Sequence, residues 1–284
     1  MADKEIFLRD LKSVTFIGRD NLDKDLKYKE DNSPTGNIKN WLRYRICSKA
    51  VWGECDIDKR VFNMYERLFE RKEPQEGDKK RLFRLKNESI ILETDTMNSF
   101  ATIFNSFMRF FYNENYRFNF ENNKGSSSNS DDNKIIDRDR YFLNNIDIWY
   151  YNFSPSIKAY FDIFNTFAAY THCLANMILV PKGYNSGRYR RTKDFWDLSL
   201  MDIYEKHSKE KIFIWFRGHC KDDLLLKDWF YGNQVKVLFT DHLFEHKLPK
   251  DKREFMYCLK NINKHIEARA DALAKCDELK DFEF

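Results

Sequence analysis

Apolar side chains recur every three or four residues in four segments of the chain, the spacing of one face of an α-helix. This pattern predicts helices over about residues 56–72, ending before Pro74, and over about 97–111. Ser154-Pro155 is a typical helix start, with serine before the first turn and proline inside it. A fourth helix, about 25 residues long, is predicted from Asp251, where Glu254 completes a capping pair.

Shorter apolar runs predict a few strands. Residues 82–85 and 89–93 predict a small hairpin or two short strands, and the run 176–180 before Pro181 predicts a buried strand. Residues 234–239 predict a half-buried strand. A few strands among many helices indicate the α+β class, with one helix-dominated globular domain.

A polar segment interrupts this pattern at residues 113–139. Its centre, Asn122-Asn-Lys-Gly-Ser-Ser-Ser-Asn-Ser-Asp-Asp-Asn133, has too few apolar side chains to bury a core. We therefore expect a flexible polar insertion over 113–139. It separates an N-terminal subregion, 1–112, from a C-terminal subregion, 140–284, and we expect both to belong to one domain.

Composition adds that the core is aromatic. The 284 residues include 26 Phe, 15 Tyr and 6 Trp but only 9 Gly, which favours long helices packed through bulky side chains. The start of the chain lacks a signal-peptide pattern, and no run approaches about 20 uncharged apolar residues. We therefore expect a cytoplasmic protein that does not enter a membrane, with six reduced cysteines. The net charge of +4 permits a nucleic-acid partner without requiring one.

Common catalytic and cofactor motifs are missing from the sequence. It has no GxxxxGK[ST] loop, GxGxxG fingerprint, HExxH, GxSxG or paired CxxC. These absences count against common NTPases, dehydrogenases, zincins and α/β-hydrolases. We accordingly expect neither a cofactor nor a resident metal, and whether the protein is an enzyme stays open.

The most informative stretch is the basic segment after the predicted strand at 176–180. We interpret residues 182–193 as a loop in which arginines and lysines alternate with tyrosines. Guanidinium groups bind phosphate through two N–H groups, and tyrosines stack on bases, so this composition is typical of a contact to RNA or a single strand. A solvated basic loop is the plain alternative. The residues expected to bind nucleic acid are Arg188, Tyr189, Arg190, Arg191 and Lys193.

Two histidines are candidates for acid–base chemistry. His219 lies within a few residues of Asp222 and Asp223, and His207 follows the basic segment. Asp194 and Asp197 open a predicted helix, where capping explains both. The pair His242 and His246 lacks a third metal ligand, so a surface cluster explains it.

The N-terminal half is also basic. Its cations would extend a basic groove if they converged with the 188–193 segment. They are Arg43, Arg45, Lys49, Lys59, Arg60, Arg67, Arg71, Lys72, Lys79, Lys80, Arg81 and Arg84.

Residues 177–273 resemble an uncharacterised bacterial family, one of the domains of unknown function. The matching residues are Val180-Pro181, Asn185, Arg188 and Asp194-Phe-Trp-Asp197-Leu-Ser-Leu200. Phe195 stands where the family has arginine, and Tyr204 and Glu205 replace a basic pair. The resemblance implies a shared fold and a bacterial or phage source, but it implies no mechanism.

Three hypotheses of function follow. The first is a protein that acts on nucleic acid, RNA rather than DNA, such as an RNA-cleaving toxin or an anti-phage defence effector. In this hypothesis His207 or His219 serves as base or acid. The second is a non-catalytic module that binds a protein partner, with oligomers allowed. The third is an enzyme for nucleotides or small molecules with an unfamiliar site.

Overall fold

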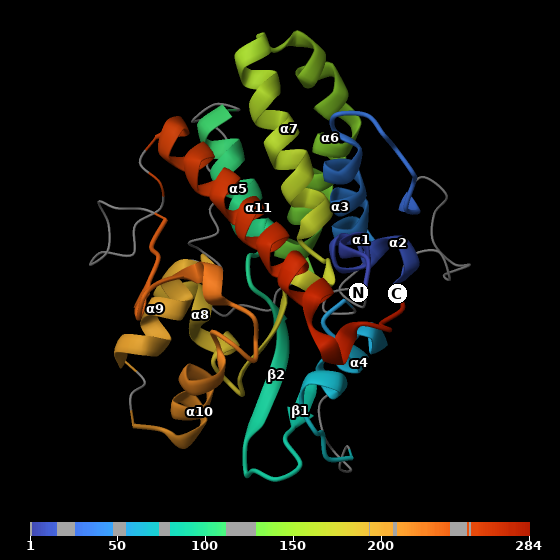
Figure 1. Cartoon of the computed structure of the whole chain (residues 1–284). Helices are drawn as coiled ribbons and strands as arrows, with labels where there is room; N and C mark the ends of the chain where they lie inside the picture. The colour runs from blue at the N-terminus through green and yellow to red at the C-terminus, as the bar shows by residue number, and fades with distance from the viewer. Residues whose placement is uncertain are drawn as a thin grey trace.

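The computed structural model describes residues 2–15, 26–47, 55–73, 80–111, 129–192, 194–206, 209–238, 249 and 251–284 (Figure 1). Within these ranges the chain is helix-dominated with a few short antiparallel strands, so the predicted α+β class is confirmed. The helices are α1 (Lys4–Leu8), α2 (Lys12–Thr15), α3 (Gly36–Ile46), α4 (Lys59–Leu68), α5 (Phe100–Phe111), α6 (Asn129–Asn152), α7 (Pro155–Tyr170), α8 (Asn185–Thr192), α9 (Trp196–Lys206), α10 (Lys211–His219) and α11 (Lys252–Lys275).

The main sheet has three antiparallel strands in the order β1-β2-β3. β1 (Leu82–Arg84) and β2 (Ile91–Thr96) form the predicted hairpin, and β3 (Met177–Pro181) is the predicted buried strand. β2 pairs with β3 from Leu92 opposite Pro181 to Thr96 opposite Met177. A separate hairpin of β4 (Phe230–Tyr231) and β5 (Gln234–Val235) contains only the start of the strand predicted over 234–239, and Phe239 lies outside the described residues.

The long helices carry the aromatic core that the composition predicts. Residues of α5 and α7 pack ring against ring, and the rings of Phe107 and Phe164 are stacked with centroids 4.4 Å apart. Burying one such side chain stabilises the fold by roughly 1.5–3 kcal/mol. A cavity of about 10 Å³ remains between α5, α6 and α7, lined only by apolar side chains. It has room for about one water molecule, so it does not fit a cofactor.

Helix α11 crosses the molecule and joins the helical layer to the sheet (Figure 1). Its Arg269 is 1% exposed and donates hydrogen bonds to the carbonyls of Ala175, Met177 and Leu224. Arg269 also donates to the hydroxyl of Tyr65 on α4, which itself donates to the Met177 carbonyl. One guanidinium thus holds the start of β3 between α4 and α11.

Two segments predicted to be irregular are helical. Residues 129–139 belong to α6, although the polar composition predicted an insertion over 113–139; residues 112–128 lie outside the described part. The ion pair of Asp139 with Arg45 of α3 is buried and measures 2.8 Å. This tertiary contact holds the polar part of α6, because packing rather than propensity stabilises most helices. The second such segment is α8, in the predicted loop 182–193.

Within the described ranges no helix combines the length and the apolar character needed to cross a membrane.

Candidate functional site

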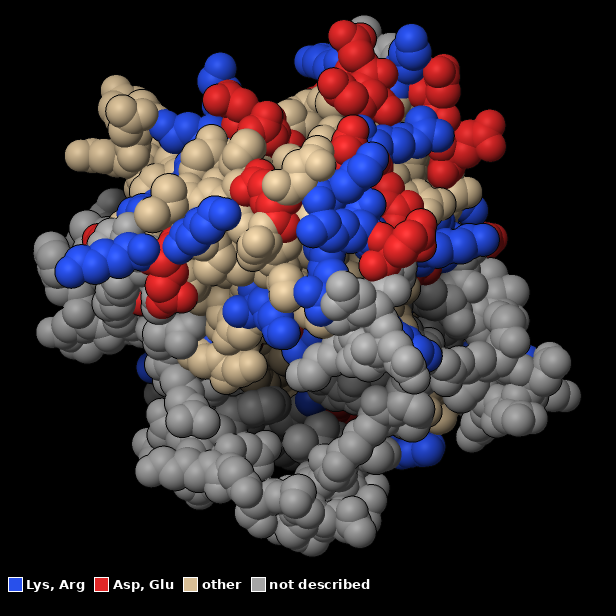
Figure 2. All heavy atoms as spheres, turned by 90° about the horizontal axis from the view of Figure 1, so that it is seen from below, with Lys and Arg blue, Asp and Glu red and all other residues tan. Residues whose placement is uncertain are grey.

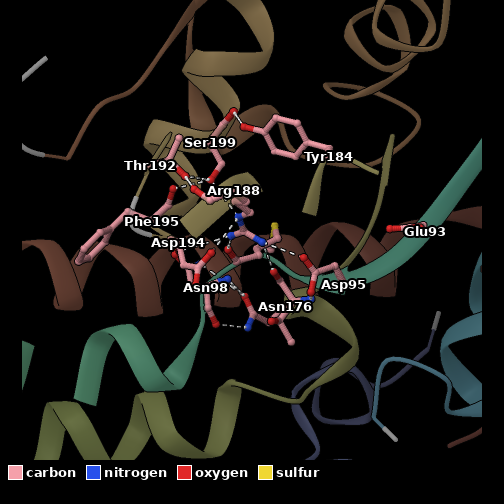
Figure 3. A network of polar contacts seen from close by, with 12 residues as sticks. Glu93, Asp95, Asn98, Asn176, Tyr184, Arg188, Thr192, Asp194, Phe195 and Ser199 are labelled. Atoms are coloured by element: carbon pink, nitrogen blue, oxygen red, sulfur yellow. Dashed lines mark hydrogen bonds and ion pairs between the residues drawn. The ribbon is translucent and has the colours of Figure 1, made fainter. Parts of the chain in front are cut away.

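Arg188 on α8 lies at the centre of a buried polar network (Figure 3). The side chain is 2% exposed. Nε donates to Ser199 Oγ at 2.9 Å, and one terminal nitrogen donates to Asp95 Oδ2 at 3.0 Å and to the Thr96 carbonyl at 2.8 Å. The other donates to the carbonyls of Met97 and Asp194.

These contacts use all five N–H donors of the guanidinium. The structure therefore gives Arg188 an internal role in place of the expected phosphate contact. It ties α8 to the end of β2 and to the start of α9. The sequence shows a run of cations around Arg188, but its main carboxylate partner is 93 residues away and no local pattern indicates it.

Three carboxyl groups interact with this guanidinium. Burial raises the pKa of Asp95 more than Arg188 lowers it, and burial likewise raises the pKa of Asp194. Burial and the neighbouring Asp95 carboxylate together raise the pKa of Asp56 to about 7. Buried carboxylates are stable only beside a compensating charge, and the Arg188 guanidinium provides that charge for these three acids.

Asp194 adopts the left-handed backbone conformation, with φ +61°. It precedes α9 by two residues, so it does not occupy the helix cap that the sequence predicted. Its carboxylate faces the Arg188 guanidinium at 3.9 Å and accepts a hydrogen bond from Thr102. An aspartate tolerates this conformation better than most residues, and the two contacts hold it there.

The rest of the basic segment is described only in part. Tyr189, Arg190 and Arg191 belong to α8, but their side chains lie outside the described part of the structure, as does the whole of Lys193. His207 also lies outside the described residues, together with His242 and His246. The expected roles of these residues stay predictions.

The structure brings His219 and Asp223 together. His219 ends α10, and the following turn returns the chain so that Asp223 N–H donates to the His219 carbonyl at 3.1 Å. The side chains then meet, with His219 Nδ1 2.5 Å from Asp223 Oδ2. The predicted pairing of His219 with a nearby acid is therefore present, and it uses Asp223.

Aromatic side chains set the orientation of the imidazole. The His219 ring stacks on Trp215, with centroids 4.4 Å apart, and meets the edge of Phe69 at 6.5 Å. Trp215 is itself fixed by a hydrogen bond from its indole N–H to Glu88. The sequence did not indicate Trp215 or Phe69 as part of this site, although Trp215 precedes His219 by four residues and thus shares its helix face.

The dyad remains accessible to solvent. The exposed fraction is 38% for the His219 side chain and 51% for Asp223. An ionised carboxylate only accepts hydrogen bonds, so in a neutral imidazole that donates to Asp223 the proton is on Nδ1 and Nε2 is the acceptor. Within the described part of the chain, Nε2 has no hydrogen-bond partner. This arrangement is a base whose second nitrogen is oriented by a carboxylate.

The surroundings of the dyad carry charges of both signs. Lys86 contacts Glu70, the residue after Phe69: its N–H donates to the carbonyl of Glu70 at 2.8 Å, and its ammonium pairs with the Glu70 carboxylate at 3.2 Å. Figure 2 shows the lower face of the molecule, where basic and acidic side chains are interspersed. No group of three His, Cys, Asp or Glu side chains among the described residues is placed to bind a metal ion.

Comparisons with known proteins return no relative. No family model, no curated protein and no solved structure matches the chain. The resemblance over residues 177–273 therefore stays a prediction.

Proposed function

We propose that the protein cleaves RNA at the His219–Asp223 pair without a metal ion. The observation that carries the proposal is the 2.5 Å contact between Nδ1 and Asp223 on an exposed imidazole. A carboxylate on Nδ1 fixes the tautomer and stabilises the imidazolium that forms when Nε2 takes a proton. A general base of this kind contributes about 10²–10⁴-fold to a rate.

The proposed reaction uses the ribose 2′-hydroxyl as nucleophile. Nε2 takes its proton while the 2′-oxygen bonds to the adjacent phosphorus and the bond from phosphorus to the 5′-oxygen breaks. The imidazolium then returns the proton to the 5′-oxygen, so the products are a 2′,3′-cyclic phosphate and a 5′-hydroxyl. Lys86 is the cation we propose to offset the charge that develops on phosphorus-bound oxygens. A toxin or an anti-phage effector could act through this RNA cleavage.

The test is cleavage of labelled RNA by the purified protein in EDTA. We expect products that end in 2′,3′-cyclic phosphate, and no cleavage of an otherwise identical DNA strand, which lacks the nucleophile. Cleavage that EDTA abolishes, or products with a 3′-hydroxyl, would contradict the proposal because they indicate a metal-activated water. An RNA that stays intact after prolonged incubation would contradict it as well.

One observation favours a second function, binding of a protein partner. Three large apolar side chains on α6, Tyr141, Ile148 and Tyr151, are 45%, 58% and 68% exposed. Their spacing of seven and three residues places them on one face of the helix. Exposed apolar stripes of this kind mark interaction surfaces.

A further inference from the structure

The last four residues, Asp281–Phe284, pack against α1 and α4, where the two ends of the chain meet (Figure 1). The ring of Phe282 is 4% exposed and stacks on Phe7 of α1 with centroids 5.7 Å apart. Phe282 is therefore part of the core and anchors the segment. Asp281 and Glu283 are exposed, and Phe284 is half-buried.

Three arginines hold the rings of this segment. The guanidinium carbons of Arg9 and Arg60 lie 4.7 Å and 4.9 Å from the ring centre of Phe284, and that of Arg67 lies 5.5 Å from the ring centre of Phe282. Asp58 fixes the plane of Arg60 through contacts of 2.7 Å to Nε and 2.5 Å to a terminal nitrogen. We call Arg9, Arg60 and Arg67 the tail-binding surface.

The N–H groups of Arg9 and Arg67 are available to a ligand. Arg9 and Arg67 are exposed, and neither forms a hydrogen bond or an ion pair with any residue in the described ranges. Their guanidinium carbons lie over aromatic rings, and their N–H groups are unpaired within the described ranges. Arginine contacts single-stranded nucleic acid in this way, with its face against a base and its edge toward phosphate.

The bound segment has the chemical pattern of a single strand. Asp281, Phe282, Glu283 and Phe284 alternate a negative charge with an aromatic ring, as phosphates alternate with bases along RNA. We infer that the tail-binding surface is a site for single-stranded RNA and that Glu283 and Phe284 occupy it as an internal competitor. The choice of RNA rests on the function proposed above.

Helix α4 connects this surface to the catalytic pair. Arg60 lies in its first turn, and Phe69, which follows its last residue, meets the edge of the His219 ring. Nine residues of helix separate the two positions by roughly 14 Å. Because residues nine apart lie on opposite sides of a helix, an RNA strand on the tail-binding surface would have to pass around α4 to reach His219.

The test is binding of a fluorescently labelled single-stranded RNA, measured by anisotropy at low salt. Phe284→Ala removes the competitor ring and keeps the Phe282 anchor, so we expect RNA to bind about tenfold more tightly, the effect of about 1.4 kcal/mol. Phe284→Tyr keeps a ring for the guanidiniums and should bind RNA as the wild type does.

The arginines are tested in the Phe284→Ala background. We expect Arg9→Ala and Arg67→Ala each to weaken binding several-fold and to lower the slope of log affinity against log salt by about 0.7. Arg253→Ala, an exposed arginine in the first turn of α11, is the matched control and should leave the affinity and the slope unchanged.

Unchanged or weaker RNA binding by Phe284→Ala would overturn the inference, as would equal effects of Arg9→Ala and Arg253→Ala. His219→Asn should bind RNA with unaltered affinity, which separates the two proposals. Absence of RNA cleavage by the wild type would contradict only the catalytic pair, whereas arginine variants that bind RNA normally would contradict only the tail-binding surface.

Discussion

Arg188 joins segments that are far apart in the sequence, because its five donors reach the end of β2, the turn at Asp194 and Ser199 of α9. Removing one partner of such a buried pair leaves the other charge without compensation. Asp95 would be left with its charge buried.

We therefore expect Arg188→Ala to lower the free energy of unfolding by about 3–5 kcal/mol, measured by urea denaturation. Arg253→Ala removes an exposed arginine from a helix and should change it by less than about 0.5 kcal/mol. Equal stabilities of the two variants would mean that the network around Arg188 does not support the fold.

Asp197 gives a pH-dependent contribution to stability. It is buried at the start of α9 and accepts a hydrogen bond from the Leu238 N–H at 2.7 Å, yet burial raises its pKa to about 6. Between about pH 4 and pH 6 the folded state thus holds a proton that the unfolded chain has released. Stability attributable to Asp197 consequently falls as pH rises through this window, by at most about 1.4 kcal/mol per pH unit.

The check is the difference in unfolding free energy between the wild type and Asp197→Asn at several pH values. The variant is subtracted from the wild type because a second group also titrates. Burial lowers the pKa of His172 well below its usual value, so below about pH 6.5 this residue makes stability rise with pH, the opposite of Asp197. We expect the wild type to lose stability relative to Asp197→Asn from pH 4 to pH 6. A constant difference would contradict the raised pKa of Asp197.

At the scale of elements, the long amphipathic helices were predictable and the polar ones were not. α5, α7 and α11 bury continuous aromatic or aliphatic stripes that the sequence shows directly. α8 and the first part of α6 have few apolar positions, and distant partners hold them: Asp95 for α8 and Arg45 for α6. Such pairings between remote residues leave no periodic signal.

The exposed stripe on α6 leads to a prediction about self-association. If two copies pair their α6 helices antiparallel, Tyr141 of one meets Ile148 of the other, and Arg140 lies near Asp147. We expect the wild type to form dimers with rising concentration in sedimentation velocity. Ile148→Glu should remain monomeric with unchanged helix content, because the substituted side chain is already 58% exposed.

A second variant on α6 and a control on α9 complete this test. Asn144→Glu changes an exposed position between Tyr141 and Ile148 and should also weaken a dimer, whereas Glu205→Gln on α9 should not. A wild type that stays monomeric at all concentrations would show that a second copy is not the partner of α6.

At the scale of the whole molecule, the sequence predicted the α+β class, the hairpin, the buried strand and four main helices. It also singled out His219 and its acidic neighbours, because His219, Asp222 and Asp223 are close together in the sequence. It did not predict the aromatic support from Trp215 and Phe69. It also did not predict the contact of residues 281–284 with Arg9, which follows α1, and with the arginines of α4. These sites depend on how α4, α10 and the chain ends are packed together, which local patterns do not contain.

If Asp223 orients His219 for proton transfer, substitutions of two neighbouring acids should differ in their effect on RNA cleavage. We would measure single-turnover RNA cleavage in EDTA for Asp223→Asn and Asp222→Asn, both exposed positions in the turn after α10. We expect Asp223→Asn to slow cleavage at least about tenfold, the effect of about 1.4 kcal/mol in the barrier, and Asp222→Asn to cleave at the wild-type rate. Equal rates for the two variants would contradict this role of Asp223.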